Sequence, residues 1–155
     1  MTASLHRAED IAAEIKARIE ACTVAQGAET NLGAKVYQGR RRIDDDMIPC
    51  LSLIEADDNP SRTRVRDEYE IAQRYVLFAY VPCDPNNPNL AAHAAIRDMK
   101  RALFNTEGKG DARFGGKVVS VDYIGRDIGP RADGAAFVVA AVEVVVNYVE
   151  RLSAP

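Results

Sequence analysis

The sequence contains no tryptophan, two histidines and three cysteines among its 155 residues. Cys22, Cys50 and Cys83 are widely spaced, form no CxxC pair and have no histidine close by. This pattern argues against a zinc site or a disulfide framework, and it favours free, mostly buried thiols in a reducing compartment. Neither His6 nor His93 lies beside a recognisable nucleophile or orienting carboxylate, so we expect the chain not to be an enzyme.

Long apolar runs and a surplus of basic charge are also missing. No stretch approaches 18 apolar residues, and charged residues interrupt the amino-terminal segment, so we expect neither a membrane span nor a signal peptide. The formal net charge of −3 argues against a dedicated nucleic-acid binder. The 47% of hydrophobic residues that are present suit one domain over 1–155, with a core that needs neither a disulfide nor a metal.

Hydrophobic periodicity predicts two helices and several strands. The helices cover 4–22, with Ser4 as N-cap, and 90–105, with Asn89 as N-cap. The predicted strands cover 35–39, 47–55, 68–82, 117–130 and 135–150. The polar segment 56–67 is predicted to be a mobile excursion between two of them. This order predicts an α+β fold, a mostly antiparallel β-sheet with two helices packed on one face.

Two of the predicted strands have unusual features. The second half of 68–82 is apolar on both of its faces, so we expect it to be buried on both. The even-numbered face of the last strand is apolar throughout. At about 3.3 Å per residue, 135–148 would run about 46 Å, whereas a compact domain of this size has a diameter of about 38 Å. The strand must therefore bend, or reach beyond its globule and pair with a neighbouring copy.

A charged loop precedes the second strand, where residues 39–49 read GRRRIDDDMIP. Its charged residues are Arg40, Arg41, Arg42, Asp44, Asp45 and Asp46. The aspartates offer carboxylate oxygens to Mg²⁺ or Ca²⁺, but the spacing of an EF-hand is absent. The arginines offer a phosphate site, although the aspartates would repel a polyanion. A solvated loop and an interface loop remain open; in a ring, the arginines of one subunit could meet the aspartates of the next.

A glycine-rich segment, 106–116, follows the second predicted helix and precedes a strand. A phosphate-binding loop requires the opposite order, strand then helix, so we expect a flexible turn here. The segment carries the basic residues Lys109 and Arg113.

Three long stretches resemble one known family. They read VYQGRRRIDDDMIPCLSLIE, then QRYVLFAYVPCDPNNPNLAAHAAIRDMKRALF, then GGKVVSVDYIGRDIGPRADGAAFVVAAVEVVVNYV. In this order they are similar to the tail-terminator, or tail-completion, proteins of long-tailed phages and prophages, of the lambda tail-terminator type. The resemblance covers roughly residues 1–152. The charged loop before its strand and the CDPNNP turn before the helix are its most specific parts.

The resemblance implies a small α+β subunit that assembles into a hexameric ring, without catalysis and without a cofactor. The ring would cap the tail tube, stop its polymerisation and join the tail to the head connector, and DNA would pass through its lumen without sequence-specific binding. The expected partners are thus copies of the chain, the tail tube protein and the head–tail connector protein. The expected location is the virion tail, after assembly in the cytoplasm of the bacterial host.

Residues carried over from the resemblance are candidate contacts with subunits or partners. They are Arg40, Arg41, Arg42, Asp44, Asp45, Asp46, Arg62, Arg64, Arg66, Lys109 and Arg113. A component of the head–tail connector or neck is one alternative, because it shares the ring geometry. A Mg²⁺-dependent enzyme that uses the three consecutive aspartates is an alternative from another class.

Overall fold

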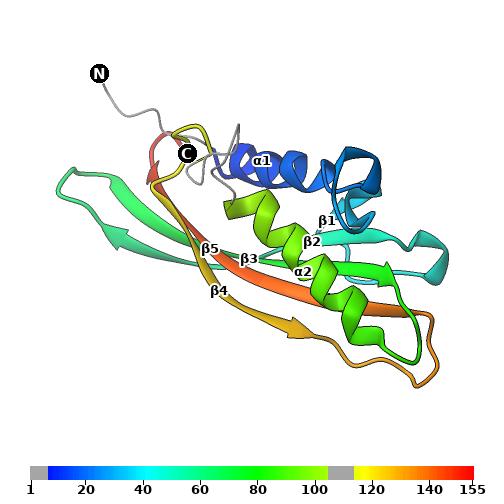
Figure 1. Ribbon diagram of the computed structural model, residues 1–155. Coiled ribbons are helices and arrows are strands. Elements are labelled where there is room, and N and C mark those ends of the chain that lie inside the picture. The colour runs from blue at the N-terminus through cyan, green and yellow to red at the C-terminus, as the bar shows by residue number, and fades with distance from the viewer. Residues whose placement is uncertain (1–6, 105–113) are drawn as a thin grey trace.

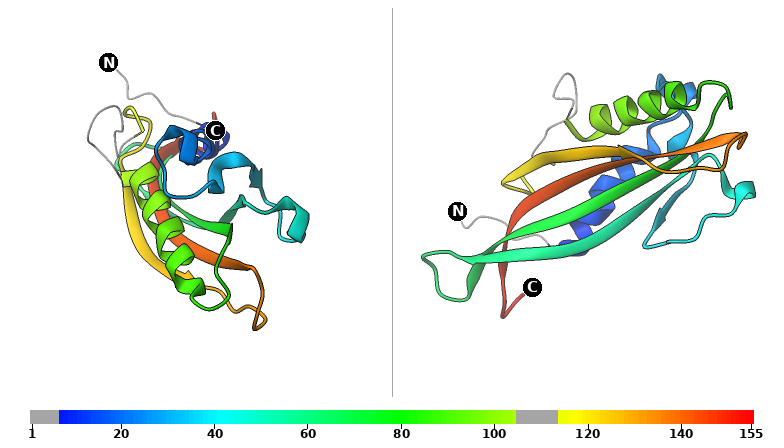
Figure 2. Two further views of the ribbon diagram at one scale, coloured as in Figure 1. Left: turned by 45° about the vertical axis from the view of Figure 1, so that its right-hand side comes forward. Right: turned by 90° about the horizontal axis from the view of Figure 1, so that it is seen from below.

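The computed structural model of the protein describes residues 7–104 and 114–155 (Figure 1). Its main elements are α1 (Ala8–Glu20), β1 (Val36–Gln38), β2 (Cys50–Arg62), β3 (Glu68–Pro82), α2 (Pro88–Phe104), β4 (Ser120–Ile128) and β5 (Phe137–Arg151). The strands form a sheet in the order β1-β2-β3-β5-β4, in which β1 pairs with β2 in parallel and every other pair is antiparallel. Both helices lie on one face of this sheet (Figures 1 and 2), which confirms the predicted α+β fold.

Strand alternation builds the core between the sheet and the helices. Odd-numbered residues of β3 and even-numbered residues of β5 point to the helices, because successive side chains of a strand alternate between faces. The buried residues of these two strands are Ile71, Tyr75, Leu77, Ala79, Val81, Val138, Ala140, Val142, Val144, Val146 and Tyr148. The helices contribute buried residues at helical spacing, Ile11, Ile15 and Ile19 from α1 and Ala92, Ala95, Ile96, Met99 and Leu103 from α2.

A buried carboxylate fastens the segment after α1 to α2. Asp98 is 2% exposed and accepts hydrogen bonds from the backbone N–H of Glu29 at 3.0 Å, the backbone N–H of Thr30 at 2.8 Å and the Thr30 hydroxyl at 2.6 Å. On the surface, the Glu29 carboxylate pairs with Arg97 at 2.8 Å and Arg101 at 3.2 Å. The hydrogen bond from Arg97 is the main reason that the pKa of Glu29 lies below its usual value.

The predicted element boundaries need several corrections. Helix α1 begins at Ala8, and the predicted cap Ser4 lies outside the described residues. Helix α2 begins at Pro88, so Asn89 is its second residue rather than its cap. Proline is favoured in the first helical turn, because the N–H that it lacks would have no hydrogen-bond acceptor within the helix. The largest error concerns 56–67, because β2 continues to Arg62 and pairs with β3. Cross-strand pairing, which local composition does not reveal, keeps these polar residues in the sheet.

The long strand β5 bends within its own subunit (Figure 1). It lies between β3 and β4, and its pairing with β3 runs from Phe137 to Arg151. Its pairing with β4 runs from Ala140 to Asn147, so over these residues both edges of the strand are occupied and neither is free to pair with a neighbouring copy. The part that projects from the body is instead the hairpin of β2 and β3 (Figures 1 and 2).

The strand edges left free in the described residues are poor templates for another strand. Register shifts interrupt β2 between Glu55 and Asp58 and β4 between Tyr123 and Gly125. Pro60 has no N–H to donate, and bulges and proline are devices that protect a sheet edge from pairing. No helix in the described part of the chain is long and apolar enough to cross a membrane.

Candidate assembly surface

The face of the sheet opposite the helices carries a patch of apolar side chains. Its members are Val76, Phe78 and Tyr80 of β3 and Phe137, Val139, Ala141 and Val145 of β5, all of them partly buried. The register sets Tyr80 opposite Val139 and Phe78 opposite Ala141, so the side chains of the two strands adjoin. No helix of 7–104 or 114–155 covers this patch, which we call the bare sheet face (Figures 1 and 2).

The bare sheet face corrects one expectation. The apolar pattern of 68–82 predicted burial on both faces in its second half, but Val76, Phe78 and Tyr80 remain partly exposed in the single chain. The reason is that both helices pack on the other side. A strand that is apolar on both faces is typical of a sheet covered on both sides. The described residues cover only one of these two faces with helices.

The charged loop borders the bare sheet face. Ser52 of β2 lies directly opposite Phe78 and hence on the same face, and its hydroxyl donates a hydrogen bond to the backbone carbonyl of Arg40. Residues 39–49 therefore pass over this side of β2, where Cys50 is fully buried. Burial raises the pKa of the Cys50 thiol, which makes it an unreactive packing residue.

Several charges of the loop already have partners inside the chain. The Arg40 guanidinium lies 5.1 Å from the centre of the Tyr37 ring, and its Nε donates to the carbonyl of Arg42 at 3.3 Å. Arg42 Nε lies 3.6 Å from Asp44 Oδ1. This pair is well exposed, so it contributes little to stability. Opposite charges of the loop thus meet within one subunit.

The remaining aspartates of the loop sit in a short turn. Asp45 and Asp46 are exposed in η3 (Asp45–Met47), and Asp44 accepts the backbone N–H of Met47 in a capping arrangement. Among the residues that the structure describes, no three His, Cys, Asp or Glu side chains come together as ligands for a metal. The consecutive aspartates therefore have the geometry of a capped turn.

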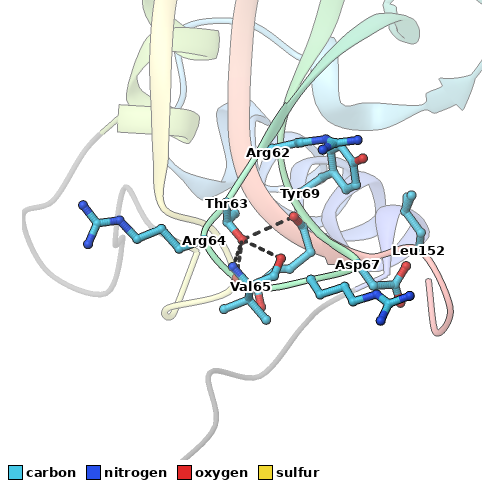
Figure 3. A pocket seen from close by; sticks show the side chains of 9 residues that line it. Arg62, Thr63, Arg64, Val65, Asp67, Tyr69 and Leu152 are labelled. Atoms are coloured by element: carbon cyan, nitrogen blue, oxygen red, sulfur yellow. Dashed lines mark hydrogen bonds between the residues drawn. The ribbon is translucent and has the colours of Figure 1, made fainter.

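Three candidate arginines lie on the projecting hairpin. Arg62 ends β2, and Arg64 and Arg66 belong to the turn before β3, all of them exposed. The turn and the end of the chain surround a hollow of about 490 Å³, lined by residues 62–69 and Leu152 (Figure 3). Val65, between two of the arginines, is 51% exposed. We call residues 62–68 the arginine tip.

Hydrogen bonds order the arginine tip. The Thr63 hydroxyl accepts from the backbone N–H of Val65 at 3.1 Å, and the Thr63 N–H donates to the carbonyl of Glu68 at 3.3 Å. The carbonyl and the side chain of Asp67 accept the backbone N–H groups of Leu152 and Ser153, both at 3.0 Å. An acidic side chain of the turn is thereby held toward the chain end, while Arg64 points away from the hairpin (Figure 3). In the described residues, no ion pair joins the tip arginines to a carboxylate.

A groove of about 530 Å³ lies between α1 and the edge of the sheet. It exists because β1 ends at Gln38, opposite Leu53, and Gly39 turns the chain away with a φ of +75°. Its lining residues are Ala8, Glu9, Ala12, Ala13, Gln38, Gly39, Arg41, Leu53, Ile54 and Glu55. Alanines of α1 form one wall of this α1–β2 groove, and two carboxylates and one guanidinium accompany them.

Two of the predicted contact residues cannot be placed on this surface, and one charged cluster on it was not predicted. Lys109 and Arg113 lie outside the described residues. The sequence-based reading missed Arg74, which reaches Glu143 at 2.8 Å and Asp57 at 3.0 Å on the same side as the bare sheet face. Alternation marks Arg74 and Glu143 as outward-facing polar residues, but only the sheet register shows that they are neighbours.

No family model and no curated protein matches the chain.

Proposed function

We propose that this chain is a structural subunit of a phage tail, a tail-terminator-like protein whose copies form a ring at the end of the tail tube. The ring stops polymerisation of the tube and joins the tail to the head connector. The observation that carries the proposal is the bare sheet face. An apolar strand face that lacks a covering layer in the single chain is a surface that another protein covers in the assembled state.

Another copy of the chain is the partner that best fits this surface. The bare sheet face is bordered on one side by the charged loop, and the Arg74–Glu143 pair lies next to it on the same side of the sheet. Apolar centres with a charged rim are typical of specific protein interfaces. The apolar centre of such a surface supplies the affinity.

The chemistry of the described residues also favours a structural role. The two most buried cysteines have raised pKa values because they are desolvated, so neither is an activated nucleophile. The buried carboxylate of Asp98 is used in a structural contact with the segment before β1. These groups hold the fold together and leave assembly surfaces as the main features.

The sequence resemblance supplies the identity of the assembly. It covers the charged loop, the β3–α2 unit and the final hairpin in one order. A ring forms when a head-to-tail contact between different surfaces closes by rotation. In this role the chain needs no cofactor, and DNA passes through the lumen without being read.

Light scattering and native mass spectrometry of the purified chain test the proposal, together with co-sedimentation on purified tail tubes. We expect a closed multiple of the 16.9 kDa subunit, alone or on the tube end. Phe78→Glu should abolish assembly, because an unpaired charge in an interface costs about 3 kcal/mol, which is more than a 100-fold loss per contact. Val76→Thr with Val145→Thr keeps the β-branched shape and should weaken assembly without unfolding the strand.

Leu90→Glu is the matched control, because Leu90 is 65% exposed in the first turn of α2, on the helix side of the molecule. It should assemble as the wild type does. A wild-type chain that stays monomeric at high concentration and does not bind tubes contradicts the proposal. Binding to connector proteins but not to tubes would instead assign the chain to the neck.

A further inference from the structure

We infer that the arginine tip of one copy inserts into the α1–β2 groove of the next copy. This inference rests on the ring proposed above, and it names the two surfaces that meet in a contact between neighbouring subunits. The tip and the groove belong to different parts of the chain, so their contact is head-to-tail, the kind that generates rings.

The tip cannot fill the groove of its own subunit. The hairpin carries it to the far end of the β2–β3 ribbon, away from the body that bears α1 (Figures 1 and 2). Its turn is held by Thr63, Asp67 and the chain end, so it does not fold back. Only a second copy can bring an arginine tip to an α1–β2 groove.

The two surfaces are complementary in apolar character. Val65 stands 51% exposed at the turn of the tip. The groove offers the exposed methyl group of Ala13, and the buried residues Ala12 and Leu53 lie beneath it. Its volume of about 530 Å³ exceeds what one valine and the stems of its neighbours require.

The two surfaces are also complementary in charge. Arg64 and Arg66 flank Val65, and no described carboxylate pairs with them in the subunit. The groove presents Glu9 and Glu55. Among the described residues, Glu9 pairs with the exposed Arg7 at 3.7 Å, and no cation pairs with Glu55. A tip arginine can therefore reach Glu55 without breaking a described ion pair, and at Glu9 it competes with one well-exposed pair that contributes little to stability.

Arg41 sets the orientation of the tip. It lines the same groove beside Gly39 and repels the tip arginines, so these must face the Glu9 and Glu55 side. A mixture of attractive and repulsive charges fixes register more than it raises affinity. Through Arg41 the charged loop thus contributes a repulsive charge that fixes how the tip is oriented in the groove. The aspartates of the loop lie in the neighbouring turn.

Disulfide crosslinking tests the contact directly. Val65→Cys with Ala13→Cys, oxidised mildly, should yield a ladder of covalent oligomers on a non-reducing gel, because each subunit then carries one cysteine on each surface. Val65→Cys with Ala25→Cys is the matched control, since Ala25 is exposed but lies in η1 (Val24–Gln26), outside the groove. A ladder at least tenfold stronger than the control supports the inference, and equal yields overturn it.

Charge exchange provides a second, independent readout. Arg64→Glu with Arg66→Glu should raise the concentration needed for half-assembly at least tenfold, and so should Glu9→Arg with Glu55→Arg. Combining the four changes should bring it back to within about threefold of wild type, because the pairs are restored with reversed sign. Circular dichroism and the melting temperature establish that each variant is folded.

Lys100→Glu with Arg126→Glu is the control: it changes the net charge by the same amount as the two tip substitutions, but on the α2–β4 side of the molecule. It should leave assembly unaltered. The inference is overturned, while the proposed ring stands, if assembly tolerates the charge reversal in the tip and the one in the groove. It is also overturned if the variant that carries all four substitutions stays dissociated. A wild-type chain that forms no oligomer by light scattering, alone or on tubes, overturns the proposed function instead.

Discussion

Replacing Asp98 with alanine should destabilise the protein strongly. The side chain is 2% exposed and accepts three hydrogen bonds, at 2.6 to 3.0 Å, from Glu29 and Thr30. A hydrogen bond to a charged group contributes about 1.5–3 kcal/mol, and the donors left behind lose their partner. Since Glu29 lies near the surface and can recover water, we expect a total loss of about 3–4 kcal/mol rather than the sum of three bonds.

Thermal and urea denaturation followed by circular dichroism measure this loss. For a chain of this size, about 1 kcal/mol lowers the melting temperature by about 2–4 °C, so Asp98→Ala should lower it by about 6–16 °C. Thr30→Ala removes one of the three donors and should cost about 1 kcal/mol. The double variant should lose less than the sum of the single variants, because both changes break one shared contact.

Asp127→Ala is the control for this prediction. Asp127 is exposed on β4, and surface substitutions of this kind stay within about 0.5 kcal/mol. A loss below about 1 kcal/mol for Asp98→Ala would refute the reasoning, because the carboxylate would then not be what fastens the segment after α1 to α2.

Three other predictions concern pH, thiol reactivity and backbone packing. The pKa of Glu29 is lowered, mainly by the hydrogen bond from Arg97, so its ionised form stabilises the folded protein. This contribution is complete above the ordinary pKa of 4.5 and is lost as the pH falls through the lowered pKa. The difference in melting temperature between wild type and Glu29→Gln should therefore disappear in that acidic range. A thiol reagent at pH 8 should modify Cys83 first, because the other two cysteines are buried, and should modify all three only after unfolding; immediate reaction of three thiols would contradict this. Gly33→Ala should destabilise by more than about 3 kcal/mol in urea denaturation, because its Cβ would lie 2.1 Å from a backbone oxygen, whereas Gly125→Ala, which meets nothing within 4 Å, should be tolerated.

The sequence predicts the elements whose own pattern determines them. The alternation of 68–82 locates β3 with its observed bounds, and the apolar even-numbered face of 135–150 is the face that β5 buries. By contrast, residues 56–62 are polar and rich in turn formers, and they are a strand only because β3 pairs with them. Local composition carries no information on that partner, so the segment was misread as a mobile excursion.

The residues of the candidate surface can be predicted from the sequence only where local signals determine their exposure. Exposed charges such as Arg64 and Asp45 can be identified from turn signals and local charge, and the structure does place them at the surface. Which face of β3 the helices would cover could not be predicted, because that face and the opposite one are both apolar over 75–81. The α1–β2 groove depends on where β1 stops, a boundary that three residues of strand do not signal.

The two proposed contact surfaces solve different parts of the assembly problem. A contact made by a turn of about seven residues is too small for a stable interface, which buries about 800 Å² on each partner. The bare sheet face supplies apolar area but, with Arg74 and Glu143 already paired, few charges that specify a neighbour. The arginine tip supplies charges that have no described partner within the subunit. An assembly that used only the apolar face would associate without fixed register, and one that used only the tip would be weak. A closed ring requires both affinity and a single rotation between neighbours, so the two kinds of variant should fail differently: bare-face variants should lose mass, whereas tip variants that still associate should give assemblies of mixed size.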